Sequence, residues 1–354
     1  MRFFNVDLHI SVIADIRHIF ARLGHSVDSW SLSSHNWVFD RKPDAIDVLT
    51  KSNWAELTPK MCDAFFERYR EELSVYDGFI TSYVPGFSLL FERFQKPIIF
   101  ICPIRYEHPF TDNPEKWDWL NRHIKDGVAA KKIFPVANNK FDALYFTSWT
   151  NCPIQTIPSL CEYTGETHNP RHPYYICKSV IDIDLNGSNI LNISNVFPHG
   201  HSWRALYSFQ GIVHFPYQCS TMSIFEQYTA GVPLLFPTKR FSKEIYWATH
   251  THGNAGYLCQ ASFNRIKGIG PKSLLTPKYS DLDLNDFSSE RVLDVLINLS
   301  DFYDNELMPA INYFDNFSEL GRMTKVGIGF QPDNRKMRRE MVYEKWKNVI
   351  AEIF

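Results

Sequence analysis

The chain has 354 residues, of which 44% are hydrophobic and 15% aromatic, and its net charge is −2. This length predicts two globular domains, and the near-neutral charge argues against a broad nucleic-acid surface. The seven cysteines include no Cys-x-x-Cys pair, which indicates reduced thiols and a cytoplasmic protein rather than a disulfide framework or a zinc site. No stretch approaches the roughly 20 apolar residues that span a bilayer, and charged residues interrupt the opening apolar run, unlike a signal peptide.

Short apolar runs alternate with helical patterns through the first half of the chain. The predicted strands are RFFNVDL (2–8), HSVDSWSL (25–32), YDGFITSY (76–83) and KPIIFICPI (96–104). The predicted helices cover 11–23, which stops at Gly24, and 85–94, which a proline opens. Such alternation predicts a parallel α/β sheet.

A polar stretch at 163–173, YTGETHNPRHP, has the composition of a linker. A second α/β series follows it, with predicted strands YYICKSVIDI, NILNIS and GIVHFPY and a helical SWRALYSF. We therefore expect an N-terminal domain over 1–165, a C-terminal domain over 174–335 and a final helix over 336–354. The apolar face predicted for this helix consists of Trp346, Val349, Ile350 and Ile353.

The stretch STMSIFEQYTAGVPLLFP (220–237) places a single carboxylate, Glu226, after a hydroxyl-rich loop that follows a strand. Ligands of open parallel sheets bind beyond the carboxyl ends of the strands. Helix N–H groups with the Ser220, Thr221 and Ser223 hydroxyls would suit a phosphate, and Glu226 would accept two hydrogen bonds from a ribose diol. The alternative is structural, because Ser-x-x-Glu is also a helix capping box.

The order of strand, hydroxyl loop, glutamate, Gly-x-Pro and strand resembles the donor-binding segment of nucleotide-sugar glycosyltransferases of the GT-B fold. The resemblance implies an α/β protein with two Rossmann-like domains whose parallel sheets face each other across a cleft, with the final helix crossing back to the N-terminal domain. It implies a nucleoside diphosphate sugar, UDP-linked, as donor. Glu226 takes the place of the family's ribose-binding glutamate, and His214 that of its upstream histidine near the phosphate.

A second resemblance lies in HISVIADIRHIFARLGHSV (9–27). Inverting members of the family that glycosylate small molecules have His-Ile at the end of the first strand and Gly-His-x-Val after the next helix. The resemblance implies that His9 is the general base, and Asp7 on the same strand is the alternative base. Gln218 stands where the retaining branch has a glutamate, which favours inversion.

Basic and polar residues that follow other predicted strands add candidates for ligand contacts. Lys239, Arg240 and Lys178 are candidates for the pyrophosphate. Arg105 and His108 follow a buried strand of the N-terminal half and are candidates for the acceptor side.

Two other classes of function remain open. Asp182 and Asp184 have the Asp-x-Asp spacing of metal-dependent GT-A transferases, and a non-catalytic nucleotide-sugar-binding module would keep the same fold. The leading prediction is sugar transfer to a glycan, protein or small-molecule acceptor with no resident metal or cofactor and no nucleic-acid partner. The runs NKFDALYFTSW and STMSIFEQY are also similar to glycosyltransferases of large DNA viruses of algae, which would place the protein in the host cytoplasm.

Overall fold

The structure is a computed structural model that describes the chain except for residues 40–41, 184–187, 252–256, 259–280, 329–334 and 354. The chain divides into two compact units. The first unit comprises Met1–Ser159, Asn264–Asp286 and Met341–Phe354, and the second comprises Leu160–Phe263 and Phe287–Glu340. The first long segment therefore ends at Ser159 instead of the expected 165, and the second half of the last helix belongs to the first unit.

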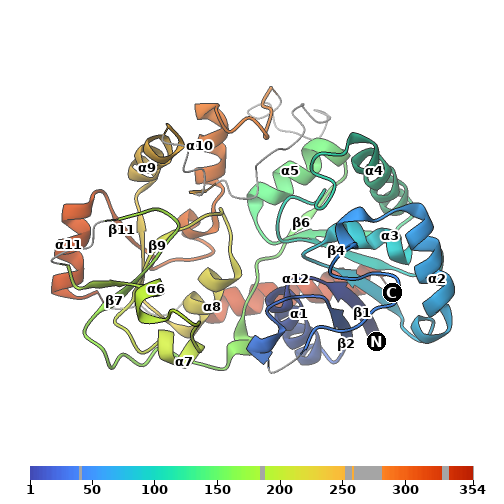
Figure 1. Cartoon of the computed structure of the whole chain (residues 1–354), viewed down its shortest axis with the longest axis horizontal. Helices are drawn as coiled ribbons and strands as arrows, with labels where there is room; N and C mark the ends of the chain where they lie inside the picture. The colour runs from blue at the N-terminus through green and yellow to red at the C-terminus, as the bar shows by residue number, and fades with distance from the viewer. Residues whose placement is uncertain (40–41, 184–187, 252–256, 259–280, 329–334, 354) are drawn as a thin grey trace. The chain divides into compact units, whose positions relative to one another are not determined.

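The first unit contains a six-stranded parallel sheet in the order β2-β1-β3-β4-β5-β6. Its strands are β1 (Arg2–Asp7), β2 (Ser26–Ser31), β3 (Gly78–Thr81), β4 (Ile98–Cys102), β5 (Ile133–Ala137) and β6 (Gln155–Thr156). Its α-helices are α1 (Ile10–Arg22), α2 (Pro59–Leu73), α3 (Ser88–Phe91), α4 (Pro114–Ala129) and α5 (Lys140–Thr150). Short 3-10 helices lie at η1 (Asn36–Phe39), η2 (Trp54–Glu56), η3 (Pro85–Phe87) and η4 (Glu92–Phe94) (Figure 1).

Buried apolar runs explain why these segments form strands. Every residue of β3 and β4 is buried, as expected for central strands of a parallel sheet that helices cover on both faces. Helix α1 buries apolar residues at helical spacing, including Ile13, Ile16 and Phe20. The chain leaves this helix through Gly24, whose φ of 82° is a left-handed conformation that glycine adopts without strain. The four strands and the helical segments predicted for this half are therefore confirmed.

The second unit contains a five-stranded parallel sheet in the order β11-β10-β9-β7-β8. Its strands are β7 (Tyr175–Ser179), β8 (Ile190–Asn192), β9 (Ile212–Phe215), β10 (Leu234–Pro237) and β11 (Asn312–Phe314). Its α-helices are α6 (Ile193–Val196), α7 (Trp203–Leu206), α8 (Met222–Ala230), α9 (Lys239–Thr251), α10 (Glu290–Asn298) and α11 (Phe317–Val326). Short 3-10 helices lie at η5 (Glu162–Thr164) and η7 (Asp301–Tyr303).

The two sheets share one connectivity. Numbered from its own first strand, the second sheet has the order 2-1-3-4-5, and the first sheet has the order 2-1-3-4-5-6. Both are doubly wound sheets of the Rossmann-like class, in which the direction of winding reverses beside the first strand. The predicted fold class, two Rossmann-like α/β domains as in the GT-B fold, is confirmed.

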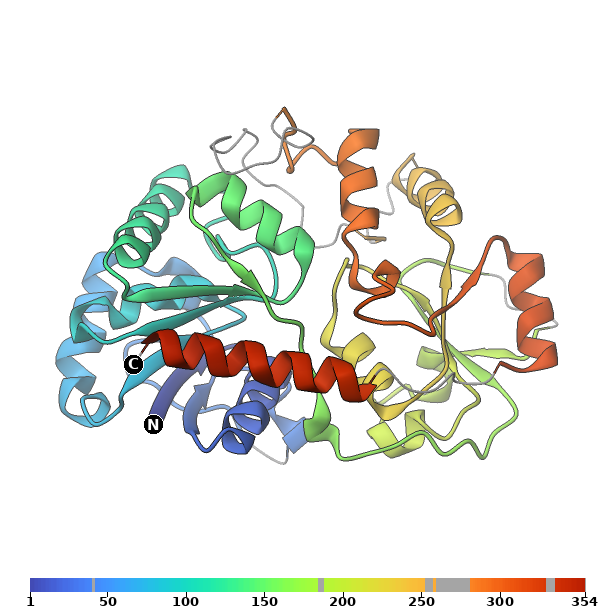
Figure 2. The same ribbon diagram turned by 180° about the vertical axis from the view of Figure 1, so that it is seen from behind.

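The last helix, α12 (Arg335–Ile353), starts in the second unit and ends in the first. Within the first unit it lies beside α1 (Figure 2), where Trp346 meets Phe20 edge to face at 5.4 Å between ring centroids. Val342, Trp346, Val349 and Ile350 are all buried. Ile353, the fourth residue of the predicted apolar face, is only half-buried, so three of its four residues, Trp346, Val349 and Ile350, belong to a core.

The described cysteines are buried, and the described helices include no candidate for a membrane span. Cys62, Cys102, Cys152, Cys161, Cys177 and Cys219 are buried thiols that are not joined in disulfides. Among the helices of the described residues, none combines the length and the apolar content needed to cross a membrane.

We expect Trp346→Ala to lower the free energy of unfolding by about 3–5 kcal/mol, because it removes a large ring that is 2% exposed. Urea unfolding followed by circular dichroism measures the change. Asn348→Ala, at an exposed position of the same helix, is the control and should stay within about 0.5 kcal/mol of the parent. Equal unfolding midpoints for the two variants would show that α12 does not stabilise the first unit.

Candidate functional site

In the second unit, polar residues gather where the winding of the sheet reverses. Strands β7 and β9 are neighbours, and the chain leaves them toward opposite edges of the sheet. Lys178 lies near the carboxyl end of β7, and the loop after β9 leads into α8 with Glu226. The crevice beyond such a pair of strands is the usual ligand site of a doubly wound sheet.

Glu226 is not a capping residue. Helix α8 begins at Met222 with Thr221 as its N-cap, and its first turn contains no acidic residue. The capping-box alternative is therefore wrong, because Ser223 lies inside the helix and Glu226 one turn further along. Glu226 is only 8% exposed. A buried carboxylate needs hydrogen-bond donors or positive charge to replace the water that it loses.

Two aromatic side chains supply those partners. The Tyr163 hydroxyl donates to Oε1 of Glu226, and the Trp203 indole Nε1 donates to Oε2 at 3.1 Å. The two rings meet edge to face with their centroids 5.7 Å apart. Neither residue was predicted to belong to the site. Tyr163 lies in the predicted linker and Trp203 in a separate predicted helix, so nothing in the sequence placed them near Glu226.

Lys178 supplies positive charge next to this carboxylate. Its Nζ donates to Oγ of Ser223 at 2.6 Å, and Thr221 Oγ1 lies 3.3 Å from the same oxygen. Burial lowers the pKa of Lys178, while the charge of Glu226 opposes that shift. Ser220 is half-buried in the loop before α8. The structure thus brings together Glu226, Lys178, Ser223, Tyr163 and Trp203, which we call the Glu226 cluster.

His214 lies in the core of the second unit rather than at a surface where a phosphate would bind. The residue is 2% exposed, its ring stacks on Phe236, and its Nε2 lies 2.6 Å from Oε1 of Gln227. Burial, with the charge of Lys178, lowers the pKa of His214 to about 3, against the effect of the Gln227 hydrogen bond. The neutral ring therefore donates to Gln227 and helps to hold α8 against the core. The predicted contact of His214 with a phosphate is wrong, because the side chain is buried in the core.

Lys239 and Arg240 begin α9 and are exposed. Arg240 pairs with Asp315, with its Nη2 2.6 Å from Oδ2, and also with Glu244. The Lys239 ammonium donates to Oδ1 of Asn298 at 2.9 Å. In the structure both cations bind neighbouring side chains at the start of α9, and their expected role at a pyrophosphate stays a prediction.

In the first unit, the reversal of winding falls between β1 and β3, and His9 follows β1 directly as the N-cap of α1. Its ring is half-buried, 5.0 Å from that of Tyr83, and its Nδ1 is buried without a hydrogen-bond partner among the described residues. Burial, with the charge of His35, lowers the pKa of His9 to about 4. The imidazole is therefore neutral at physiological pH.

Three further rings continue from His9. Tyr83, after β3, lies 5.7 Å from the ring of His108, after β4, and His108 lies 5.4 Å from that of Trp54. All four residues are half-buried. Burial lowers the pKa of His108 to about 4. We call these four residues the ring row: His9, Tyr83, His108 and Trp54. The ring row carries no formal charge at neutral pH.

Two predicted residues of the first unit are core residues instead. Asp7 is 0% exposed, and its carboxylate accepts hydrogen bonds from the Ser31 and Ser82 hydroxyls at 3.2 and 3.1 Å. Arg105 is 2% exposed and pairs with Asp142 at 2.9 Å. Neither side chain reaches solvent, so the structure removes Asp7 as the alternative base and Arg105 from the acceptor side.

The Asp-x-Asp alternative has little support in the described part of the chain. Asp182 is exposed beyond the end of β7, and Asp184 lies outside the described residues. Within the described ranges, no group of three or more His, Cys, Asp or Glu side chains is arranged to hold a metal ion.

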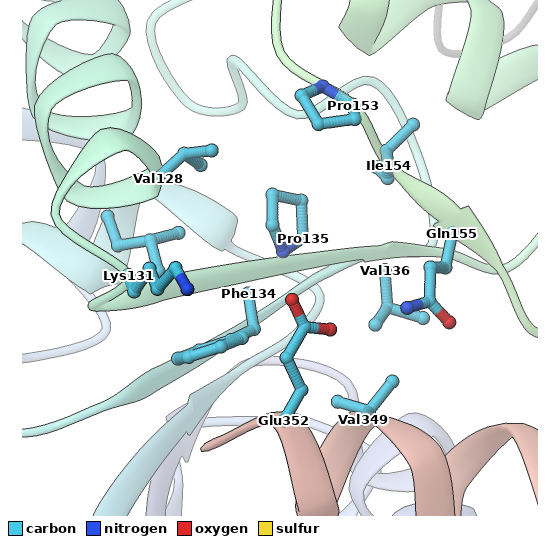
Figure 3. Close-up of a pocket in the computed structure, with 11 residues that line it drawn as sticks. Val128, Lys131, Phe134, Pro135, Val136, Pro153, Ile154, Gln155, Val349 and Glu352 are labelled. Carbon is cyan, nitrogen blue, oxygen red and sulfur yellow. The ribbon is translucent and has the colours of Figure 1, made fainter.

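A pocket of about 220 Å³ lies on a different part of the first unit, along β5 and the approach to β6 (Figure 3). Most of its lining is apolar, for example Phe134, Ile154 and Val349. Figure 3 shows Glu352 of α12 extending toward β5 beside Phe134 and Val136. The residues of the Glu226 cluster and of the ring row are not part of this lining.

The comparisons with known proteins concern the fold. No family model matches the chain, and no curated protein matches it either. Among solved structures, the glycosyltransferase SnogD from Streptomyces nogalater is 12% identical with a TM-score of 0.36, over 67% of this chain and 81% of that one. The lipopolysaccharide outer core galactosyltransferase WaaB is 10% identical with a TM-score of 0.38, over 100% of both chains.

A co-structure of MnaA from S. aureus with UDP is 11% identical with a TM-score of 0.39, over 66% of this chain and 78% of that one. At these identities and scores the likeness carries no inference about ligands. Assignments of function therefore depend on the residues of this chain.

Proposed function

We propose that the protein is a glycosyltransferase that moves a sugar from a nucleoside diphosphate sugar, UDP-linked, to an acceptor hydroxyl. The observation that carries this proposal is the Glu226 cluster. It places a buried carboxylate and a lysine at the winding reversal of the second unit, beside the N–H groups at the start of α8. The motif resemblance around 220–237 points to the same ligand.

Each part of the cluster matches a part of the donor. The first N–H groups of a helix have no partner within the helix and attract anions, so the start of α8 would bind the diphosphate. Lys178 and the Ser220, Thr221 and Ser223 hydroxyls would add charge and hydrogen bonds there. Glu226, one turn further along α8, would accept the ribose hydroxyls.

The reaction breaks two bonds, the one from the anomeric carbon to the diphosphate and the acceptor O–H, and forms two, the new glycosidic bond and an N–H bond on His9. The acceptor oxygen attacks the anomeric carbon, the bond from that carbon to the diphosphate oxygen breaks, and the nucleoside diphosphate leaves. His9 takes the acceptor proton, and the product has the opposite anomeric configuration. The row His9–Tyr83–His108–Trp54 would contact the acceptor, a glycan, protein or small molecule. The similarity to algal-virus transferases would favour a glycoprotein glycan in a host cytoplasm.

We expect Glu226→Gln to weaken binding of UDP by about 1–3 kcal/mol, because the variant loses a charged acceptor for the ribose hydroxyls. Isothermal titration calorimetry measures the change. Glu306→Gln alters an exposed glutamate of the same unit and should leave affinity unchanged. If both variants bind UDP as the parent does, with unchanged melting, the ribose assignment is wrong.

We expect His9→Ala to keep donor affinity and to lower turnover by ~10²–10⁴, the range for a lost general base. The base acts when unprotonated, so kcat/KM of the parent should fall only as pH drops through about 4. His199→Ala, at an exposed histidine of the second unit, is the control. Near-normal turnover in His9→Ala, or a product that retains the donor's configuration, would refute this role.

Transfer should not need a divalent cation, because helix N–H groups and Lys178 can offset the charge of the leaving diphosphate. Turnover of a UDP sugar in excess EDTA, compared with turnover in added Mn²⁺, measures this. Loss of activity in EDTA with recovery in Mn²⁺ would favour the metal-dependent alternative. Nucleotide binding with no turnover of any donor would favour a non-catalytic binding module.

A further inference from the structure

The carboxylate of Glu226 is held symmetrically. One neutral donor binds each oxygen, Tyr163 at Oε1 and Trp203 at Oε2. A carboxylate has about four lone-pair sites, so within the described part of the chain one further site on each oxygen is left for a ligand. Two free sites side by side suit two hydroxyls on adjacent carbons better than they suit a single hydroxyl.

The two residues before Tyr163 make contacts with neighbouring helices. The residue before it, Glu162, pairs with Arg339 of α12 at 3.0 Å. Cys161 Sγ lies 3.7 Å from the carbonyl oxygen of Met222, at the first residue of α8. The first contact ties the η5 turn to α12, and the second ties the residue before the turn to α8, the helix that carries Glu226.

The Trp203 donor is anchored by a helix start. Trp203 is the first residue of α7, whose N-cap Ser202 accepts a hydrogen bond from Ala205 N at 3.2 Å. Its ring packs edge to face on Tyr163 at an interplanar angle of 72°. The cap and the ring contact both favour the orientation in which the indole N–H donates to Glu226.

We propose that Tyr163 and Trp203 are positioning residues that set Glu226 to accept a vicinal diol, so that the site prefers ribonucleoside over 2′-deoxyribonucleoside diphosphates. This inference rests on the proposed function, because it concerns the same site. Glu226 contacts the diol, and the two aromatic residues act only through Glu226. Without either donor, the carboxylate would rotate and would no longer accept hydrogen bonds from both ribose hydroxyls at once.

The experiment compares UDP with 2′-deoxy-UDP by titration calorimetry on the full chain. The parent should bind UDP roughly tenfold more tightly than 2′-deoxy-UDP, the equivalent of one lost hydrogen bond to a charged group. Tyr163→Phe removes the hydroxyl and keeps the ring, and Trp203→Phe removes the indole N–H and leaves a smaller aromatic ring. Each should weaken UDP binding roughly 3- to 30-fold, change 2′-deoxy-UDP binding less than about twofold, and bring the ratio of the two affinities toward one.

Tyr313→Phe is the matched control, since it removes a hydroxyl that donates to the carbonyl of Phe302 elsewhere in the unit. It should leave the affinity ratio unchanged. Equal weakening toward both nucleotides in Tyr163→Phe and Trp203→Phe would mean a structural role and overturn the inference, as would no change in either. Melting curves check that the variants fold.

Glu226→Gln distinguishes failure of the positioning role of Tyr163 and Trp203 from failure of the ribose assignment of Glu226. If it abolishes the preference for UDP while Tyr163→Phe and Trp203→Phe keep it, the ribose assignment survives and the positioning role fails. If Glu226→Gln leaves the preference intact, or if the parent binds neither nucleotide, the proposed function itself fails at this site. Loss of the preference in all three variants supports both.

Discussion

The burial of one carboxylate organises the second unit. Glu226 is 8% exposed, and an ionised group at that depth is tolerated only when hydrogen bonds and opposite charge replace water. The replacements come from three separate segments, namely η5 with Tyr163, β7 with Lys178 and α7 with Trp203. Those segments must converge on α8 for the carboxylate to be stable there.

Other contacts hold α8 itself in place. Arg338 of α12 lies over the ring of Phe225, with its guanidinium carbon 5.1 Å from the centroid, and donates to Thr229 Oγ1 at 3.2 Å. Gly231 then ends the helix at a φ of 80°, a conformation that favours glycine. A Cβ there would come within 2.9 Å of an Arg335 nitrogen. The Gly-x-Pro turn of the sequence motif therefore serves the packing of α8 as well as the turn.

Much of this architecture could be predicted from the sequence, and the exceptions have a common cause. Apolar runs identify β1, β4, β9 and β10 because a covered parallel sheet requires them. Burial of a polar residue, in contrast, depends on contacts far along the chain. Asp7 accepts a hydrogen bond from Ser82, and His214 makes one with Gln227. Both residue types are typical of ligand sites, but here both side chains are buried in a core. Tyr163 was missed for the same reason, because its partner lies 63 positions away.

The same strand order supports different chemistry in the two units. At the reversal in the second unit the structure places a carboxylate and an ammonium, whereas at the reversal in the first unit it places neutral rings. The connectivity fixes where a ligand would bind, and the side chains determine what binds.

The neutrality of His9 limits what this residue could contribute as the proposed base. A pKa of about 4 makes proton uptake roughly 3 kcal/mol less favourable than for an exposed imidazole. Such a base is available at every physiological pH but is a weak acceptor while the acceptor oxygen still holds its proton. Under the proposed mechanism, His9 would take the proton while the acceptor oxygen bonds to the anomeric carbon, because that bond makes the proton more acidic. The barrier would then depend on His9 together with Lys178 and the start of α8, which would stabilise the leaving group.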